Sequence, residues 1–412
     1  MVVAFGLLYI VRDNNDTNQA AYWAAYMVGA EVLFRMTGGM LFYELPKYSV
    51  ILFLLTGLLV EKRLHHISFS YLIYILLLLL GIVFVDIPFS ESIRKAIAFN
   101  LSGPIALGIS AIYFYKREMT LDELLNMLFV MVLPILSMLS FLYFKTPDVR
   151  DIAFGGESNF EASGGFGPNQ VSTILGIGVF IFTVHLFFKR YIFELFLMDI
   201  LMLAYLIFRG LITMSRGGMI TAAIAISVFT FYFILSKENR IKNLLKYIGL
   251  VFVFGFVIVV YASNATGGML INRYTNKNIN GMKQNDVSAG RVDLFKSEIE
   301  GFFENPFFGI GVGGSKYYRQ ESMEVVAASH NELSRLLAEH GSIGLLILFI
   351  LIVVPLKHIL KESFLARGFL FSFLIFWFLT INHSAMRIAF PAFIYGLSVL
   401  SLQINNIKQE KL

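Results

Sequence analysis

The chain has 412 residues, of which 57% are hydrophobic and only 15% are charged. Soluble domains carry about 25% charged residues, so this composition excludes a soluble globular protein and indicates an integral membrane protein. The absence of cysteine excludes a disulfide framework and any thiolate metal site. The formal net charge of +5 comes from Lys and Arg in short connectors, which indicates membrane topology rather than binding to nucleic acid.

The apolar runs are long and continuous, which predicts helices, because a spanning segment must satisfy its own backbone hydrogen bonds. The first run, 1–11, is too short to span, since a crossing helix needs about 20 residues. We predict an all-α fold, a polytopic membrane protein with about 12–13 transmembrane helices. The remaining membrane segments are expected at 20–36, 48–60, 67–85, 92–115, 121–144, 171–188, 191–208, 219–235, 247–263, 342–359, 368–380 and 388–403.

The longest polar interval, 264–341, divides the chain into three parts. Residues 1–263 are expected to form the N-terminal transmembrane helices. The interval itself is expected to form one large external loop with short helices and the catalytic motifs. Residues 342–412 are expected to form the C-terminal transmembrane helices and a cytoplasmic tail.

Positive charge predicts which face each connector occupies. If every apolar run crosses once, the basic clusters at 61–66, 116–117, 189–190, 237–246, 357–367 and 408–411 share one face, which is then cytoplasmic. The connectors 145–167, 209–218, 266–340 and 382–387 fall on the external face. The same alternation places Met1 on the external face, so either a helix precedes this segment or the segment is re-entrant.

Four arginines on the external face are candidates for ligand binding, because the Lys and Arg of membrane proteins normally gather inside. An arginine presents a fork of donors that suits phosphate oxygens. The alternative is that each one extends to the membrane interface from an apolar helix. Several arginines beside glycine-rich turns favour the binding site, and the two glycines after Arg216 would let a ligand approach the backbone. The four are Arg209, Arg216, Arg291 and Arg387.

The stretch SHNE at 329–332 has the form of a capping box, with Ser329 as N-cap and Glu332 three residues later. His330 would be the first residue of an amphipathic helix that stops at Gly341. Free backbone N–H groups favour anions there, and the helix dipole disfavours imidazolium. His330 would then be neutral and able to act as a general base. The alternative is that His330 only packs against the first turn.

Other motifs are weaker. The run GIGVGG at 309–314 resembles a phosphate-cradling turn, but no strand precedes it, which excludes a dinucleotide fold. Asn169 and Gln170 offer amides to a sugar or to free backbone groups, and Asn169 could equally be a helix cap. No metal-binding motif is present, so neither a catalytic metal nor a cofactor is predicted. Asp286 and Asp293 either bind a cation or serve the turn before a helix.

Four pieces of sequence together resemble the O-antigen ligase and polymerase superfamily of bacterial envelope glycosyltransferases. They are GPN at 167–169, SRGG at 215–218, GRVDLF…NPFFGIGVGG at 290–314, and HN…HG from His330 to Gly341. The resemblance covers about residues 150–345. The ligase branch is usually described with an Arg, three residues and a Leu, whereas Leu294 follows Arg291 one residue sooner. Polymerase and ligase therefore both remain open.

The resemblance implies a GT-C-like helical fold and a metal-independent, inverting transfer in the bacterial inner membrane, with the active site facing the periplasm. The donor would be a glycan on undecaprenyl diphosphate, and the acceptor a saccharide in lipid A–core or in a growing polymer. Arg216 and Arg291 would hold the diphosphate, and His330 would activate the acceptor hydroxyl. The expected substrate-binding residues are Asn169, Gln170, Arg209, Asn331 and Arg387.

The competing hypothesis is a transporter or flippase of lipid-linked sugars. Such proteins place charges and broken helices near the bilayer midplane and have related halves. The sequence shows no internal repeat, but Glu31 and Arg35, four residues apart in an apolar helix, would be central to a flippase. A third possibility, a scaffolding membrane protein, leaves the external arginines unexplained.

Overall fold

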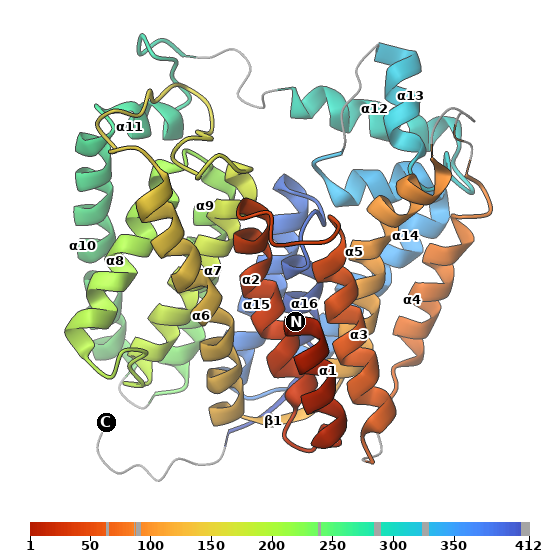
Figure 1. Ribbon diagram of the computed structural model, residues 1–412, viewed down its shortest axis with the longest axis horizontal. Coiled ribbons are helices and arrows are strands. Elements are labelled where there is room, and N and C mark those ends of the chain that lie inside the picture. The colour runs from red at the N-terminus through yellow and green to blue at the C-terminus, as the bar shows by residue number, and fades with distance from the viewer. Residues whose placement is uncertain are drawn as a thin grey trace.

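The computed structural model describes residues 1–62, 66–85, 87, 92–237, 240–283, 290–323 and 329–404, without the side chains of 240–248, 250–252 and 321–323. Asp286, the basic tail 408–411 and part of the basic connector 61–66 lie outside the described residues. Within these ranges the chain forms a bundle of helices with three further helices at one end and a small sheet at the other (Figure 1).

The bundle is built from both halves of the chain. Its first part comprises α1 (Val2–Arg12), α2 (Gln19–Met36), α3 (Leu45–Val60), α4 (Phe69–Leu80), α5 (Ile93–Phe114) and α6 (Leu121–Lys145). The middle part comprises α7 (Pro168–Phe187), α8 (Phe196–Ile212), α9 (Arg216–Leu235) and α10 (Arg240–Ala265). The last part comprises α14 (Glu332–Ile359), α15 (Phe364–His383) and α16 (Phe390–Leu397).

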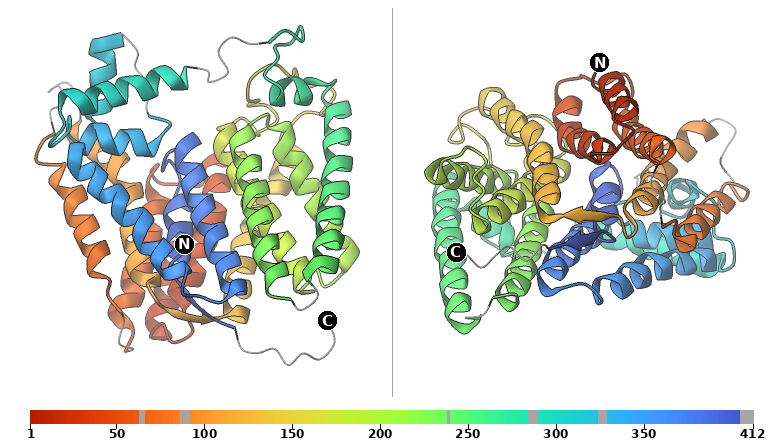
Figure 2. Two further views of the ribbon diagram at one scale, coloured as in Figure 1. Left: turned by 180° about the vertical axis from the view of Figure 1, so that it is seen from behind. Right: turned by 90° about the horizontal axis from the view of Figure 1, so that it is seen from below.

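The polar interval lies at one end of this bundle (Figures 1 and 2). It carries α11 (Met269–Tyr274), α12 (Arg291–Glu304) and α13 (Gly314–Met323). At the opposite end, β1 (Glu118–Thr120) follows the basic pair Lys116–Arg117 and runs parallel to β2 (Ser401–Gln403). The polar interval and this basic pair therefore lie at opposite ends of the bundle, and which end faces the periplasm stays a prediction.

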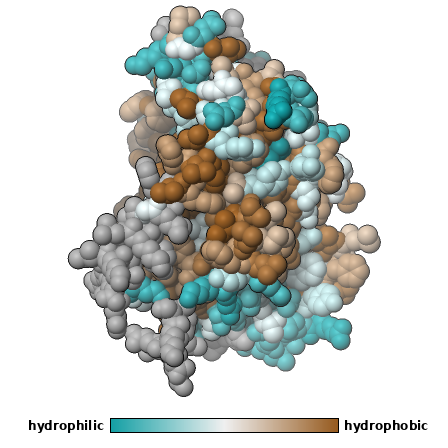
Figure 3. All heavy atoms as spheres, turned by 90° about the vertical axis from the view of Figure 1, so that its left-hand side faces the viewer, coloured by the Kyte–Doolittle hydropathy of each residue, from teal (hydrophilic) through white to brown (hydrophobic). Residues whose placement is uncertain are grey.

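The bundle has the surface of a membrane protein. Among the described residues, six helices are long and apolar enough to cross a membrane: α5, α6, α7, α9, α14 and α15. Shorter apolar helices stand beside them, and one side of the molecule shows a hydrophobic band between hydrophilic ends (Figure 3). The predicted class, an all-α polytopic membrane protein, is confirmed, whereas the number of crossings stays a prediction.

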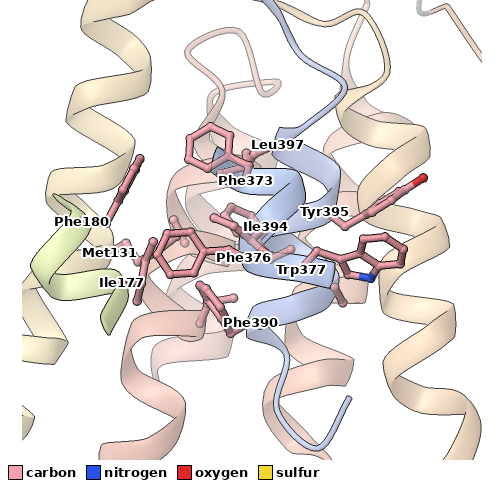
Figure 4. Packing of buried hydrophobic residues seen from close by; sticks show 14 of the residues in the cluster. Met131, Ile177, Phe180, Phe373, Phe376, Trp377, Phe390, Ile394, Tyr395 and Leu397 are labelled. Carbon is pink, nitrogen blue, oxygen red and sulfur yellow. The ribbon is translucent and has the colours of Figure 1, made fainter. Parts of the chain in front are cut away.

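The last apolar run, 388–403, does not form the membrane-spanning helix that the sequence predicts. Its helix, α16, has only eight residues, all buried, and the chain then extends into β2. Aromatic side chains of α15 and α16 fill the centre of the bundle, where Trp377 and Tyr395 lie 4.8 Å apart between ring centroids (Figure 4). The Tyr395 hydroxyl is 3.0 Å from that of Tyr71 and donates to the carbonyl of Leu351. Burial on all sides explains why the apolar pattern resembled a membrane helix.

Residues 384–389, between α15 and α16, are the reason for this difference. The sequence predicts an external polar turn at 382–387, but the chain here is non-helical and enters the bundle, with Ser384, Met386 and Ala389 all buried. Gly103 of α5 makes room for it, since a Cβ there would lie 2.6 Å from the Cβ of Met386. A non-helical backbone inside a membrane protein requires polar partners, and these lie next to the candidate site.

The amphipathic helix expected before Gly341 is present as the first part of α14. Gly341 has φ 58° and ψ −136°, so the helix bends there before its apolar second part. The GIGVGG run packs closely against two other segments. A Cβ on Gly309 would lie 2.5 Å from the carbonyl oxygen of Ala338, just before the bend, and a Cβ on Gly311 would lie 2.1 Å from the carbonyl oxygen of Phe84, after α4. Its glycines permit close packing of chain segments.

Replacing Gly341 with alanine is expected to lower the thermal unfolding midpoint of the detergent-solubilised protein. A Cβ at this position would lie 2.7 Å from the Gly309 nitrogen, and the positive φ costs about 1–3 kcal/mol for a residue with a side chain. Gly255→Ala in α10 is the matched control, because a Cβ there meets nothing within 4 Å. Equal midpoints for the two variants would contradict this account of the bend.

Candidate active site

The end of the bundle that carries the polar interval holds basic residues from five separate segments. They are Arg216 at the start of α9, Arg273 in α11, Arg291 at the start of α12, His330 before α14, and Arg387 in the 384–389 segment. Four of the five were predicted from the sequence.

Arg216 is positioned by contacts between α7 and α9. Ser215, the N-cap of α9, donates to the Asn169 side-chain oxygen at 2.7 Å, so the GPN and SRGG motifs bond to each other. Gly217 and Gly218 serve helix crossing: a Cβ on Gly217 would lie 2.4 Å from the His383 ring, and one on Gly218 would lie 2.4 Å from the Ser172 backbone. These glycines let neighbouring helices pack closely against α9. They do not open the backbone to a ligand, as the sequence suggested.

Arg273 is the residue that the sequence argument missed. The Arg216 guanidinium donates to the Arg273 carbonyl at 3.3 Å and to the Asn276 side-chain oxygen. Arg273 itself donates to the carbonyls of Met214, at 3.1 Å, and Gly156, at 2.7 Å. Burial and the charges of Arg216 and Arg291 lower its pKa. The rule that selected external arginines would have found it, since it lies in the same polar interval.

Arg291 is the first residue of α12 and follows Gly290, whose φ is 76°. The helix is fixed two turns later by Glu298, which pairs with Arg319 at 2.8 Å and accepts from the Ser334 hydroxyl at 2.5 Å. Burial, and then the charge of Arg216, lower the pKa of Arg291. Among the described residues, no carboxylate pairs with its guanidinium group, which leaves these donors available to an anion.

The predicted capping box at 329–332 is wrong. The N-cap is Asn331, whose side-chain oxygen accepts from the N–H groups of Leu333, at 2.9 Å, and Ser334, at 3.4 Å. The helix begins at Glu332, so His330 precedes it by two residues. Tertiary contacts hold His330 there instead, because its carbonyl accepts from the Ala385 N–H at 3.2 Å.

His330 is nevertheless neutral, for a different physical reason. Burial, followed by the charges of Arg387, Arg291, Arg319 and His383, lowers its pKa to about 4. Its Nε2 lies 3.5 Å from Nη2 of Arg387, while its Nδ1 is buried and has no hydrogen-bond partner among the described residues. The imidazole is therefore unprotonated at neutral pH, and the neighbouring cations make it a weak base.

The buried pair Glu31–Arg35 positions Arg387. The two side chains pair at 2.5 Å and are almost fully buried. Arg35 donates to the Arg387 carbonyl at 3.0 Å and to the Gln170 side-chain oxygen at 3.3 Å. Glu31 accepts from the Ala389 N–H at 2.6 Å. The pair therefore satisfies the non-helical backbone at 384–389, whereas a flippase would use these charges to contact its substrate.

The remaining predicted residues have structural contacts. Arg209 is only 3% exposed and donates to Thr146 and to the carbonyls of Leu142 and Ala162, so it fastens the 145–167 connector to the bundle away from the other arginines. Asn169 bonds to Ser215, Gln170 to Arg35, and Asn331 to Asn382 at 3.1 Å. Their roles in substrate binding stay predictions.

The acidic side chains of the described residues do not form a metal site. Asp293 is exposed and lies 3.9 Å from Lys296 on the same helix. Within the part of the chain that the structure describes, no group of three or more His, Asp or Glu side chains is arranged to hold a metal ion.

Arg291 lies at the electrostatic centre of this arrangement. Its charge lowers the pKa of Arg273, His330 and Arg387, while Arg216 acts on Arg273 and on Arg291 itself. The predicted residues Arg216, His330 and Arg387 thus each lie within electrostatic range of Arg291. Such an excess of positive charge at a half-buried site favours a multiply charged anion.

These features define a multi-pass helical membrane protein with an arginine-rich site at one end. Residues 200–349 match the family model described as O-antigen ligase. The match confirms that this segment belongs to the O-antigen ligase and polymerase superfamily, which supports an envelope polysaccharide ligase or polymerase role. It includes Arg216, Arg291 and His330 but not Arg387. A search of the curated proteins found no match.

Replacing Arg387 with methionine is expected to raise the pKa of His330 from about 4 toward its usual value, because one of the charges that disfavour imidazolium is removed. Histidine-selective NMR would measure the change, with His330→Gln to assign the signal. The exposed Arg150→Met in the 145–167 connector is the control. An unchanged His330 pKa in the Arg387 variant would contradict the proposed electrostatic cause.

Arg35→Gln is expected to destabilise the protein more than the double variant Glu31→Gln, Arg35→Gln. The single change leaves a buried carboxylate without its partner, which typically costs about 3–5 kcal/mol, whereas the double change removes both charges. Thermal unfolding midpoints in detergent would show the order. A double variant less stable than the single one would argue against the paired-charge explanation.

Proposed function

We propose that this protein is a glycosyltransferase that moves a glycan from undecaprenyl diphosphate to an acceptor hydroxyl at the periplasmic face, without a metal ion. The observation that carries the proposal is that Arg291 lies within electrostatic range of Arg216 and Arg273 on one side and of Arg387 and the neutral His330 on the other. The family match over residues 200–349 supports the same class of activity.

In the proposed reaction, Arg216 and Arg291 hold the diphosphate of the donor. The acceptor oxygen forms a bond to the anomeric carbon as the bond from that carbon to the phosphate oxygen breaks. The electron pair leaves with undecaprenyl diphosphate, and donors aimed at this charge stabilise the transition state. His330 takes the proton of the acceptor hydroxyl.

The donor itself would adjust the basicity of His330. Without a bound anion, burial and then the neighbouring cations hold the His330 pKa at about 4, which makes the imidazole a weak base. A bound diphosphate neutralises part of this charge and so raises the pKa. His330 would then become an effective base when the donor is in place, and the departing diphosphate is a possible destination for the proton.

The position of the site suits a lipid-linked donor. It lies at the end of the bundle opposite the basic connector at Lys116–Arg117, and basic connectors normally face the cytoplasm (Figure 1). The glycan would lie in water at the periplasmic face of the inner membrane, while the isoprenoid tail lies along apolar helices. The acceptor is a saccharide hydroxyl, either in lipid A–core or in a growing polymer. The covalent product in cells with and without the gene would distinguish the two.

His330→Ala and Arg291→Ala are each expected to reduce release of undecaprenyl diphosphate by the purified protein at least about 100-fold, without added metal. The substrates would be the lipid-linked glycan and an acceptor extract from the same cells. Arg150→Ala, which changes an exposed arginine of an external connector, should retain activity. Normal turnover in either site variant would falsify the mechanism, and dependence on a divalent metal would refute the metal-free reaction.

A further inference from the structure

A second feature of this end of the bundle is a groove of mixed polar and apolar lining that no part of the proposed reaction uses. It has a volume of about 670 Å³, which lies within the roughly 300–1,000 Å³ typical of small-molecule sites. Two connectors form it, one before α7 and one after α11. Its lining residues are Ala153, 155–161 and 278–280.

The walls of the groove are held by their own hydrogen bonds. The Asn159 N–H donates to the Thr213 carbonyl at 2.8 Å, and its side chain bonds to the backbones of Ala153 and Ala162. On the other wall, the Asn278 side-chain oxygen accepts from the Met282 N–H at 2.9 Å. Both asparagines therefore build the groove, and other side chains remain to contact a ligand.

The side chains that remain have the chemistry of a saccharide site. Phe160 is 59% exposed and offers an aromatic face to the C–H groups of a sugar ring. Glu157, Glu161 and Asn280 are exposed, and their carboxylate and amide groups can accept from or donate to sugar hydroxyls. Two carboxylates would repel phosphates and uronic acids, so the groove suits neutral sugars or amino sugars.

The groove adjoins the arginine site through Arg273. The Arg273 guanidinium donates to the Gly156 carbonyl of the groove wall at 2.7 Å, and its own carbonyl accepts from Arg216. The Glu157 carboxylate partly opposes the lowering of the Arg273 pKa, so it lies within electrostatic range of Arg273. His330 responds instead to Arg387, Arg291 and Arg319, so the groove lies on the diphosphate side of Arg291.

We propose that this groove binds the first sugars of the donor glycan, next to the diphosphate. The proposal rests on the proposed function. It assigns the donor glycan to the groove, and leaves the His330 side to the acceptor.

Binding of two probes to the full-length protein in nanodiscs tests the proposal. One probe is undecaprenyl diphosphate without sugar, and the other is the lipid-linked glycan fraction extracted from cells that lack the gene. The unchanged protein should bind the glycan-bearing lipid more tightly. Phe160→Ala and Glu161→Gln should each weaken binding of this lipid about three- to tenfold and leave binding of the sugar-free lipid unchanged. Phe160→Tyr should restore binding, because it keeps the aromatic face.

Four other outcomes would overturn the assignment. If the groove variants bind both lipids as the unchanged protein does, or if they weaken both lipids equally, the groove does not hold the donor glycan. If only the KM for the acceptor rises, the groove belongs to the acceptor. In these three cases, the proposed diphosphate site still stands if Arg291→Ala abolishes binding of both lipids. If Arg291→Ala leaves binding of both lipids unchanged, the proposed function itself fails and the groove assignment fails with it.

Discussion

The structure depends on how the polar backbone at 384–389 is satisfied inside an apolar bundle. Glu31 accepts from the Ala389 N–H, and Arg35 donates to the Arg387 carbonyl. Because water and lipid cannot replace these partners at depth, the buried ion pair holds the segment in one conformation. The Arg387 guanidinium consequently stays 3.5 Å from His330. A pair of charges far from the reacting atoms thus determines the environment of the proposed base.

The electrostatics of the candidate site also depend on Arg291, which has no carboxylate partner among the described residues. Elsewhere in the same region, cations are neutralised: Arg319 pairs with Glu298, and Arg335 pairs with Glu339 at 2.7 Å. Glu298 of α12 joins α13 through Arg319 and α14 through the Ser334 hydroxyl, whereas Arg335 and its carboxylate partners all lie within α14. Among the described residues, by contrast, no carboxylate pairs with the Arg291 guanidinium. A multiply charged anion would supply the missing charge, so substrate binding and electrostatic relief would occur together.

Much of the site could be predicted because membrane topology limits where arginine occurs. Arg216, Arg291 and Arg387 were found by asking which basic residues break the positive-inside pattern, and the structure places Arg291 within electrostatic range of Arg216, Arg387 and His330. Their roles in the reaction stay predictions. Arg209 satisfied the same rule but holds a connector, because a buried guanidinium can bond carbonyls as well as phosphates. The neutral state of His330 was expected from a helix dipole, yet it arises from burial and neighbouring cations. Local sequence cannot reveal neighbours that are distant in the chain.

The sequence by itself determined the class of protein, the order of most helices and the presence of one long polar interval between apolar segments. Hydropathy and charge decide whether a segment lies in lipid or in water. Each segment carries this information in its own residues. Only the tertiary structure decided that 388–403 contains a buried eight-residue helix, that the motif glycines serve helix crossings, and that Arg273 joins the site. These features depend on which surfaces meet. A run of apolar residues looks the same whether lipid or protein surrounds it.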